Sequence, residues 1–284
     1  MNEYSLIRHL FGNVKDLFKT DAQLIEVAGQ TWGITCDSFS LEEDLFTTDN
    51  PHVLGQNLVT ATLADLIATG CKPAFYEHTL TLPKTASETW VRDLTEGISH
   101  ALVQAGCQLV GGDMGQADTF AYTGIALGPQ LRNVSRVIPN MPQKLYVSGP
   151  LGDVNESVLK RFSTPLFELR TLPATALAAI DTSSGFMDAL WQLHEVSPHV
   201  KIEVVNPPVK DVRFLFGAAG EYELLFTSAE PVPGAICIGT VTPGETGVYV
   251  NGKEIKVPPP DPRAFASLQD YITSVEKQVH ELFG

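Results

Sequence analysis

The stretch Thr62-Leu63-Ala64-Asp65-Leu66-Ile67-Ala68-Thr69-Gly70-Cys71-Lys72-Pro73 carries the strongest indication of the fold. It closes a predicted helix over residues 53–69, because Gly70 is a helix stop signal and Pro73 favours the extended segment that follows. Asp65 interrupts an otherwise largely apolar helix. Its carboxylate is therefore a candidate for a functional role.

Five aspartates share such a short, small-residue context: Asp21, Asp37, Asp65, Asp113 and Asp181. Like charges about 4 Å apart repel by roughly 4 kcal/mol at an effective dielectric of about 20, so a converging set would need a cation. Carboxylates without histidine or thiolate favour Mg²⁺, whose coordination is commonly completed by phosphate oxygens. Any one aspartate alone is more often a cap, a turn residue or a solvated side chain. Only the set indicates a metal site.

Composition excludes several classes of function. A chain of 284 residues that is 44% hydrophobic can bury a full core, and its length predicts two domains. The net charge of -14 and the dispersed Lys and Arg residues argue against a nucleic-acid partner. The four cysteines form no C-x-x-C pair, which disfavours zinc. We expect a cytoplasmic protein, because neither a signal peptide nor a membrane-spanning run is recognisable.

The first half of the chain reads as strand, strand, helix, strand, helix, strand, strand. Pro73 and Pro83 bound an extended segment over 74–82, and Thr85-Ala86-Ser87-Glu88 predicts a capping box for a helix that ends at Gly106. Strands are expected at 108–110 and 120–127. This order is typical of an α+β domain in which helices cover one side of a sheet.

The second half repeats the mixture of helices and strands. Asn251-Gly252 is the strongest hairpin signal, and a final helix carries an apolar stripe that is expected to dock on its own domain. The other elements are predicted as strands 144–148, 202–205, 222–227 and 235–241 and helices 154–162 and 184–196. The predicted domains are 1–138, 139–257 and a Pro-rich linker with the C-terminal helix over 258–284.

Seven segments in order resemble thiamine-monophosphate kinase and the wider superfamily of aminoimidazole ribonucleotide synthetase. They are Thr20-Asp21-Ala22, Thr35-Cys36-Asp37, the Asp65 helix through Pro73, Gly111-Gly112-Asp113 with Arg136, the segment 145–152, the segment 179–185, and Glu221-Tyr222-Glu223-Leu224-Leu225-Phe226. The similarity covers about Thr20 to Leu225, and its anchors are the Asp65 helix and a Gly-Gly-Asp turn.

This resemblance implies a two-domain α+β, PurM-like architecture. It implies an N-terminal sheet-and-helix domain that forms a homodimer, a C-terminal α/β sandwich, and ATP near the dimer interface with Mg²⁺ bridging its phosphates to aspartates. Carried over by position, the five aspartates resemble metal ligands, Gly111, Gly112, Asp113 and Arg136 resemble nucleotide contacts, and Asp181 and Arg136 resemble catalytic residues. The implied activity is an ATP-dependent phosphotransfer to a small molecule, as in thiamine biosynthesis.

Several positions depart from the family pattern, and two of them remove a carboxylate from the expected metal site. Thr20 and Ser184 stand where the family has aspartates. Two alternatives therefore stay open beside the kinase: a synthetase of the aminoimidazole ribonucleotide synthetase type acting on another small substrate, and a degenerate nucleotide-binding homologue without catalysis.

Overall fold

The computed structural model describes residues 3–12, 14, 17–40, 49–152, 166–207, 209, 221–260 and 264–283. The chain forms two compact units. Unit 1 comprises residues 1–20, 134–152 and 173–284, and unit 2 comprises residues 21–133 and 153–172. The main crossing between them falls at 133/134, a few residues before the boundary that the sequence predicts. The predicted helix over 154–162 lies outside the described residues.

Unit 2 is built on a five-stranded sheet with the order β1-β2-β5-β3-β4. Neighbouring strands are antiparallel, apart from the parallel pair β3 and β4. The strands are β1 Gln23–Val27, β2 Gln30–Ser40, β3 Phe75–Pro83, β4 Gln108–Ala117 and β5 Ala121–Pro129. The predicted order of elements is confirmed for unit 2, whereas the helix Glu3–Phe11 that precedes it in the chain was not predicted.

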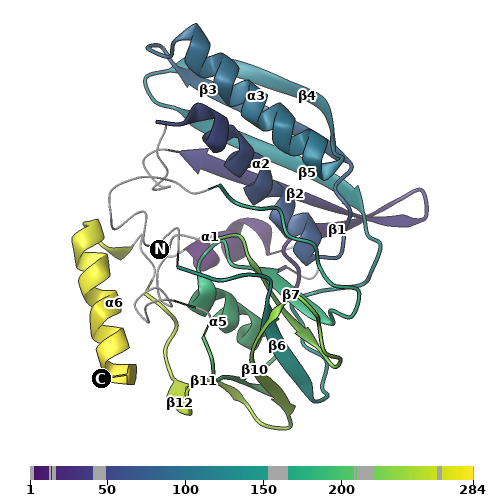
Figure 1. Ribbon diagram of the computed structural model, residues 1–284, viewed down its shortest axis with the longest axis vertical. Coiled ribbons are helices and arrows are strands. Elements are labelled where there is room, and N and C mark those ends of the chain that lie inside the picture. Colours follow the sequence, from purple (N-terminus) through teal and green to yellow (C-terminus); the bar gives the residue numbers. More distant parts are fainter. Residues whose placement is uncertain are drawn as a thin grey trace. The chain divides into compact units, whose positions relative to one another are not determined.

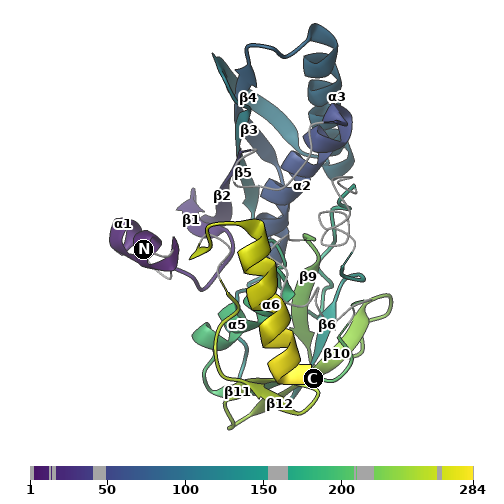
Figure 2. The ribbon, with the colours of Figure 1, turned by 90° about the vertical axis from the view of Figure 1, so that its left-hand side faces the viewer.

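Two helices cover one face of this sheet, as Figures 1 and 2 show. Helix α2 spans Pro51–Ala68, and its first turn is capped by Asn50, whose Oδ1 accepts a hydrogen bond from the Val53 amide at 3.2 Å. Helix α3 spans Glu88–Ala105 and ends at Gly106, which has the left-handed φ of 63°. The expected cap at Thr85 is wrong. Ser87 is the cap, because its Oγ accepts from the Trp90 amide at 3.1 Å.

The core of unit 2 lies between these helices and the sheet. Leu63 and Leu66 of α2, Leu94 of α3 and Tyr76 of β3 are all buried there. Side chains alternate along β3 and β5 between this core and the other face, so the sequence period of two fixes which residues face the helices.

Unit 1 is built on a seven-stranded sheet with the order β12-β11-β8-β10-β6-β9-β7. Neighbouring strands are antiparallel except for the parallel pair β8 and β11. The strands are β6 Gln143–Val147, β7 Ala178–Asp181, β8 Val200–Val204, β9 Leu224–Ser228, β10 Ile236–Pro243, β11 Gly247–Val250 and β12 Lys253–Ile255. Asn251 and Gly252 have φ of 50° and 77°, which confirms the predicted hairpin.

The helices of unit 1 are α1 Glu3–Phe11, α5 Phe186–Val196 and α6 Leu268–Phe283. Helix α5 buries Met187 and Leu190 in the core of the unit, and α6 adds Tyr271, Val275 and Val279 to the same core. Docking of the final helix on its own domain is therefore confirmed. No helix in the described part of the chain is long and apolar enough to cross a membrane.

Candidate metal site

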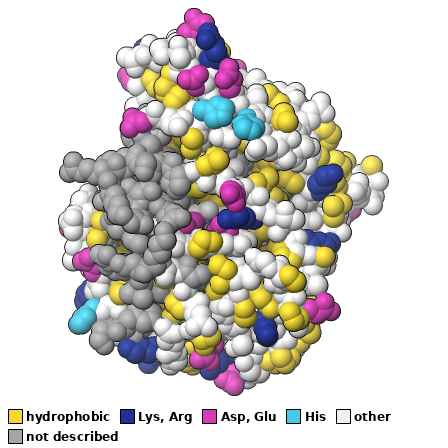
Figure 3. Space-filling view, viewed as in Figure 1, with side chains coloured by type: hydrophobic (Ala, Val, Ile, Leu, Met, Phe, Trp, Pro, Cys, Tyr) yellow, Lys and Arg dark blue, Asp and Glu magenta, His cyan; other side chains and the backbone are white. Residues whose placement is uncertain are grey.

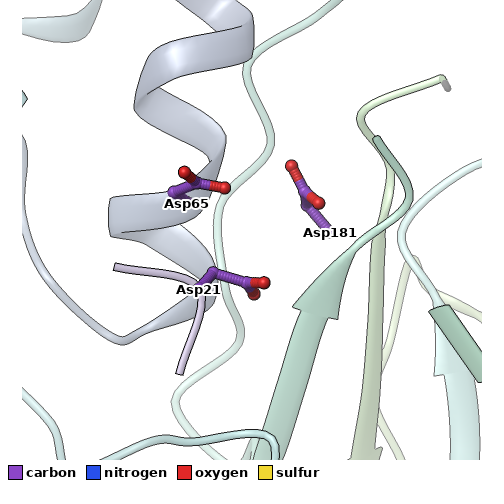
Figure 4. Close-up of side chains that lie close together, drawn as sticks. All are labelled: Asp21, Asp65 and Asp181. Atoms are coloured by element: carbon purple, nitrogen blue, oxygen red, sulfur yellow. The ribbon is translucent and has the colours of Figure 1, made fainter. Parts of the chain in front are cut away.

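Asp65 and Asp21 are the two expected ligands that unit 2 brings together. Asp65 lies in the last turn of α2, and Asp21 lies just before β1 (Figure 4). A carboxylate oxygen of each lies within 4.8 Å of one of the other, and both side chains are half-buried. Two carboxylates this close repel each other, so a cation between them would be stabilising.

Threonines fix the positions of both aspartates. Thr69 donates its hydroxyl to the Asp65 carbonyl at 2.9 Å and accepts from the Ala22 amide at 2.9 Å, which joins the end of α2 to the residue after Asp21. Thr35 of β2 donates its hydroxyl to Asp65 Oδ2 at 2.5 Å. A hydrogen bond that a hydroxyl group donates to a carboxylate stabilises the charged form of the carboxylate. Thr35 therefore both orients Asp65 and favours the anion that a metal requires.

Asp37 belongs to the same neighbourhood. It lies two residues after Thr35 on β2, and both side chains lie on the helix-covered face because successive residues of a strand alternate. Burial raises the pKa values of Tyr76 and Tyr122, and the charge of Asp37 raises them further. The two phenol groups share a hydrogen bond of 2.6 Å, and both stay neutral beside the carboxylate.

Gly111, Gly112 and Asp113 form part of strand β4 rather than the expected turn. Tyr76 pairs with Leu109 and Glu77 pairs with Gly111, so Val110 is an extra residue that bulges from the ladder. A Cβ on Gly112 would stand 2.9 Å from the His78 carbonyl, which explains the glycine. The sheet order places β4 three strands from β2, about 14 Å across at the usual strand spacing.

Asp113 is therefore separated from the Asp21 and Asp65 pair within unit 2. Its neighbour in the ladder is Thr79, whose side chain is exposed on the face away from the helices. Directly paired residues share a face, so Asp113 lies on the uncovered face of the sheet. Unit 2 by itself does not bring this aspartate to the pair.

Unit 1 holds Asp181 at the end of β7, which Figure 4 also draws. The side chain is 3% exposed, and Oδ1 accepts hydrogen bonds from the Ser183 amide at 3.2 Å and from the Ser183 hydroxyl at 2.7 Å. These donors favour the charged carboxylate in spite of its burial.

A second buried carboxylate, Glu223, lies beside Asp181 in unit 1. Strand β9 runs between β6 and β7 and is antiparallel to both, so residues just before β9 meet the ends of the other two strands. Ser148, the residue after β6, donates its hydroxyl to the Glu223 carboxylate, and Thr182 accepts from the Glu223 amide at 3.1 Å. Tyr222 has a φ of 55°, which delays the start of β9 to Leu224 and shortens the strand predicted from residue 222.

Ser184, one of the departures from the family pattern, has a carboxylate as its neighbour. Its hydroxyl donates to Asp188 one helical turn later, and Gln192 donates to the same carboxylate at 2.6 Å. Unit 1 therefore carries an acidic group next to the position where the family has its aspartate. Arg136 of the same unit is half-buried, and its amide donates to the Lys19 carbonyl at 2.7 Å.

The comparisons with known proteins agree with this fold. Residues 19–129 match the model of the AIR synthase related protein, N-terminal domain. The thiamine-monophosphate kinase of Archaeoglobus fulgidus is 26% identical over 90% of this chain and 96% of its own length. Residues 19–129 therefore carry the N-terminal domain of the AIR synthase related proteins. Over most of its length, the chain resembles the thiamine-monophosphate kinases.

Solved structures have the same fold as this chain. The structure described as AaThiL complexed with AMPPCP and TMP has a TM-score of 0.77 at 22% identity and covers 90% of this chain and 95% of its own. The structure of a HypE–HypF complex has a TM-score of 0.71 at 20% identity and covers 90% of this chain and 100% of its own. These likenesses confirm the expected two-domain α+β architecture.

Sequence reasoning missed the residues that position the carboxylates. Thr35 and Thr69 each lie inside segments that the resemblance includes, but a threonine in a strand or at a helix end is too common to be singled out. The only available signal was the alternation on β2, which places Thr35 on the same face as Asp37.

Proposed function

We propose that the protein is an ATP- and Mg²⁺-dependent phosphotransferase that acts on a small molecule. The observation that carries the proposal is the pair of carboxylates at Asp21 and Asp65, fixed by hydrogen bonds from Thr35 and Thr69. The relative from Archaeoglobus fulgidus, named a thiamine-monophosphate kinase, supports it. The AaThiL structure, described with a nucleotide analogue and TMP, supports it further.

The residues of the site fit Mg²⁺. The charged candidate metal ligands near Asp65 are all carboxylates. Among the described residues, the neighbourhood of Asp21 and Asp65 adds hydroxyl groups but neither a histidine nor a thiolate. In this proposal Asp21, Asp37 and Asp65 of unit 2 hold the metal, and Asp181 of unit 1 is a further proposed metal ligand. When bound, Mg²⁺ supplies charge neutralisation and alignment of phosphate oxygens.

The chain's own residues then have separate tasks. Thr35 and Thr69 keep the Asp65 carboxylate and the Asp21 segment in place before ATP arrives, so less order has to be created on binding. Arg136 is proposed to contact phosphate. Asp113, on the uncovered face of the sheet, is proposed to act across an interface with a second copy of the chain.

Thiamine monophosphate is the first acceptor to test, because the relatives carry that name. The loss of carboxylates at Thr20 and Ser184 predicts slow turnover of this acceptor, since each missing ligand loosens the metal that aligns the transferred phosphate. Asp188, which accepts the Ser184 hydroxyl, is the residue that we propose offsets one of the two losses.

Calorimetric titration and a coupled ADP assay test the proposal. ATP is expected to bind in Mg²⁺ but not in EDTA, and Asp65→Asn is expected to abolish binding. Asp118→Asn is the matched control, because that aspartate is exposed and pairs with Lys84 at the surface. Equal ATP affinity in EDTA and in Mg²⁺, or an unchanged affinity of Asp65→Asn, would contradict the proposal.

We propose further that unit 2 forms a homodimer through the uncovered face of its sheet. Trp32 of β2 and Phe75 of β3 stack on this face with ring centroids 6.1 Å apart, and Phe75 is 37% exposed. Ile125 and Leu127 of β5 alternate with buried residues and point to the same face. Contiguous apolar residues on an open sheet face are typical of an interface.

Light scattering on the full chain tests the dimer. A mass twice that of the 30.8 kDa chain is expected at micromolar concentration, and Ile125→Asp is expected to lower it to the monomer value. The matched control is Val103→Asp, which places the same charge on an exposed position of α3. A monomeric wild-type protein would remove the dimer and the role of Asp113 across it.

A further inference from the structure

Unit 2 contains a cavity on the outer side of its helices, away from the sheet. It is bounded by α2, by α3, by the connection 70–73 and by residues 166–172, which we term the strap, and its volume is about 690 Å³. Volumes of roughly 300–1,000 Å³ are usual for sites that bind small molecules. Figure 3 views the face that carries these helices, where apolar side chains reach the surface between charged ones.

The strap is fastened to the unit at both ends. The Phe167 amide donates to Oδ1 of the buried Asn57 at 2.9 Å, and the Arg132 guanidinium donates to the Leu172 carbonyl at 2.7 Å. Between these bonds, Phe167 is 5% exposed and Leu169 packs against the core. The outer wall of the cavity is therefore part of the folded unit.

Positive charge is concentrated in this cavity. The described part of unit 2 holds five Lys and Arg residues, and three of them line the cavity, namely Lys72, Arg132 and Arg170. The other two are Lys84 and Arg92, which pair with surface carboxylates. The single carboxylate among the lining residues is Glu168, which pairs with Arg170 at 2.6 Å.

The balance of charge in the cavity is thus opposite to that of the whole chain, which is -14. Lys72 is exposed and has no ion pair within the described residues. Burial lowers the pKa of Arg132, and a bound anion would reverse this effect. Cations that line one partly enclosed cavity attract small anions.

The remaining walls are apolar with a few amides. Val59, Leu63 and Ile67 of α2 line the cavity, and so do Ala101 and Ala105 of α3. Gln56 and Gln104 add hydrogen-bonding groups at its margin. A ligand that fits these walls has an apolar body and an anionic group.

We propose that this cavity binds a small organic anion, an apolar or aromatic body that carries a phosphate or a carboxylate. The cavity is separate from the metal site. At about 100° per residue, Leu63 and Ile67 are each about 160° around α2 from Asp65, which contacts β2 on the other side of the helix. The proposal does not depend on the proposed phosphotransferase.

Titration of the full-length protein with three naphthalene compounds tests this. The probes are 1-naphthyl phosphate, 1-naphthoate and the neutral 1-naphthalenemethanol, followed by saturation-transfer NMR and calorimetry in EDTA. At least one anion is expected to bind about tenfold more tightly than the alcohol. A preference for the phosphate identifies a phosphate ligand and a preference for the carboxylate a carboxylate ligand. Equal binding of all three, or no binding, overturns the proposal.

Variants locate the binding. Lys72→Glu changes the charge at the cavity by two units and is expected to weaken binding of the anion about tenfold. Lys84→Glu makes the same change outside the cavity and is expected to leave the affinity for the anion unchanged. Gln104→Trp, at an exposed lining position, is expected to fill the space and abolish binding while the protein stays folded. Asp65→Asn is expected to leave binding intact. Equal effects of the two lysine variants, or a loss in Asp65→Asn, would overturn the assignment.

Discussion

The Asp65→Asn variant is expected to make the metal-free protein more stable. Oxygens of Asp21 and Asp65 lie within 4.8 Å of each other, which corresponds to a repulsion of about 3 kcal/mol at an effective dielectric of about 20. Both side chains are half-buried, so water and salt reduce the gain to about 1 kcal/mol. Asparagine keeps an oxygen that can accept the Thr35 hydroxyl, so the hydrogen bond at 2.5 Å need not be lost.

Scanning calorimetry in EDTA measures this effect. An increase of 1 kcal/mol corresponds to about 2 to 4 °C in melting temperature for a chain of this size. In Mg²⁺ with ATP at about a hundred times its dissociation constant, the wild-type protein gains about 2.7 kcal/mol, and the variant is expected to gain none. The order of stability of the two proteins therefore reverses when ligands are added.

Asp118→Asn again serves as the control and is expected to change neither value, since its ion pair with Lys84 is exposed. A fall of several degrees in the metal-free melting temperature of Asp65→Asn would refute the reasoning. It would show that the carboxylate is needed by the fold.

Three further predictions follow from contacts in both units. Gly124→Ala is expected to destabilise unit 2 by about 2 kcal/mol in denaturant titrations, because a Cβ there would lie 2.3 Å from the Tyr76 hydroxyl, whereas Gly115→Ala, with open space around it, is expected to be tolerated. Burial lowers the pKa of His78, so the unfolded state binds its proton first and stability falls as the pH drops below about 6.5; His78→Phe is expected to reduce this loss in denaturant titrations compared between pH 7 and pH 5. Ser184→Asp is expected to raise phosphotransferase activity and the number of metal ions bound with ATP, and an unchanged metal count by mass spectrometry would contradict this.

Local signals predicted much of the fold. The helix that carries Asp65, the stop at Gly106 and the hairpin at Asn251-Gly252 each depend on neighbouring residues, and each is confirmed. The cap at Thr85 was wrong because the competing Ser87 satisfies the Trp90 amide. Capping patterns that overlap in sequence differ only in backbone geometry, which the sequence does not reveal.

The candidate site could be predicted only in part, because strand order is not a local property. The alternation of side chains along β2 places Asp37 on the same face as Thr35. Nothing in the sequence shows that β5 and β3 separate β2 from β4. Asp113 is for that reason distant from Asp65 in unit 2. The same applies to Glu223, which meets the end of β7 only because β9 lies between β6 and β7.

The position of β6 in unit 1 has a consequence for how the chain folds during synthesis. Its neighbours in the sheet are β9 and β10, so its pairs join residues 78 positions apart, Val147 with Leu225, to 98 positions apart, Gln143 with Val241. When β6 leaves the ribosome, one of its edges lacks a partner until β9 has been made, and the other edge lacks one until β10 has been made. Long-range pairing of this kind is slow and exposes strand edges to aggregation. Unit 2 has its whole sheet in residues 23–129 and can complete that sheet earlier, so strand edges are expected to stay unpaired for longer in unit 1 than in unit 2 during synthesis.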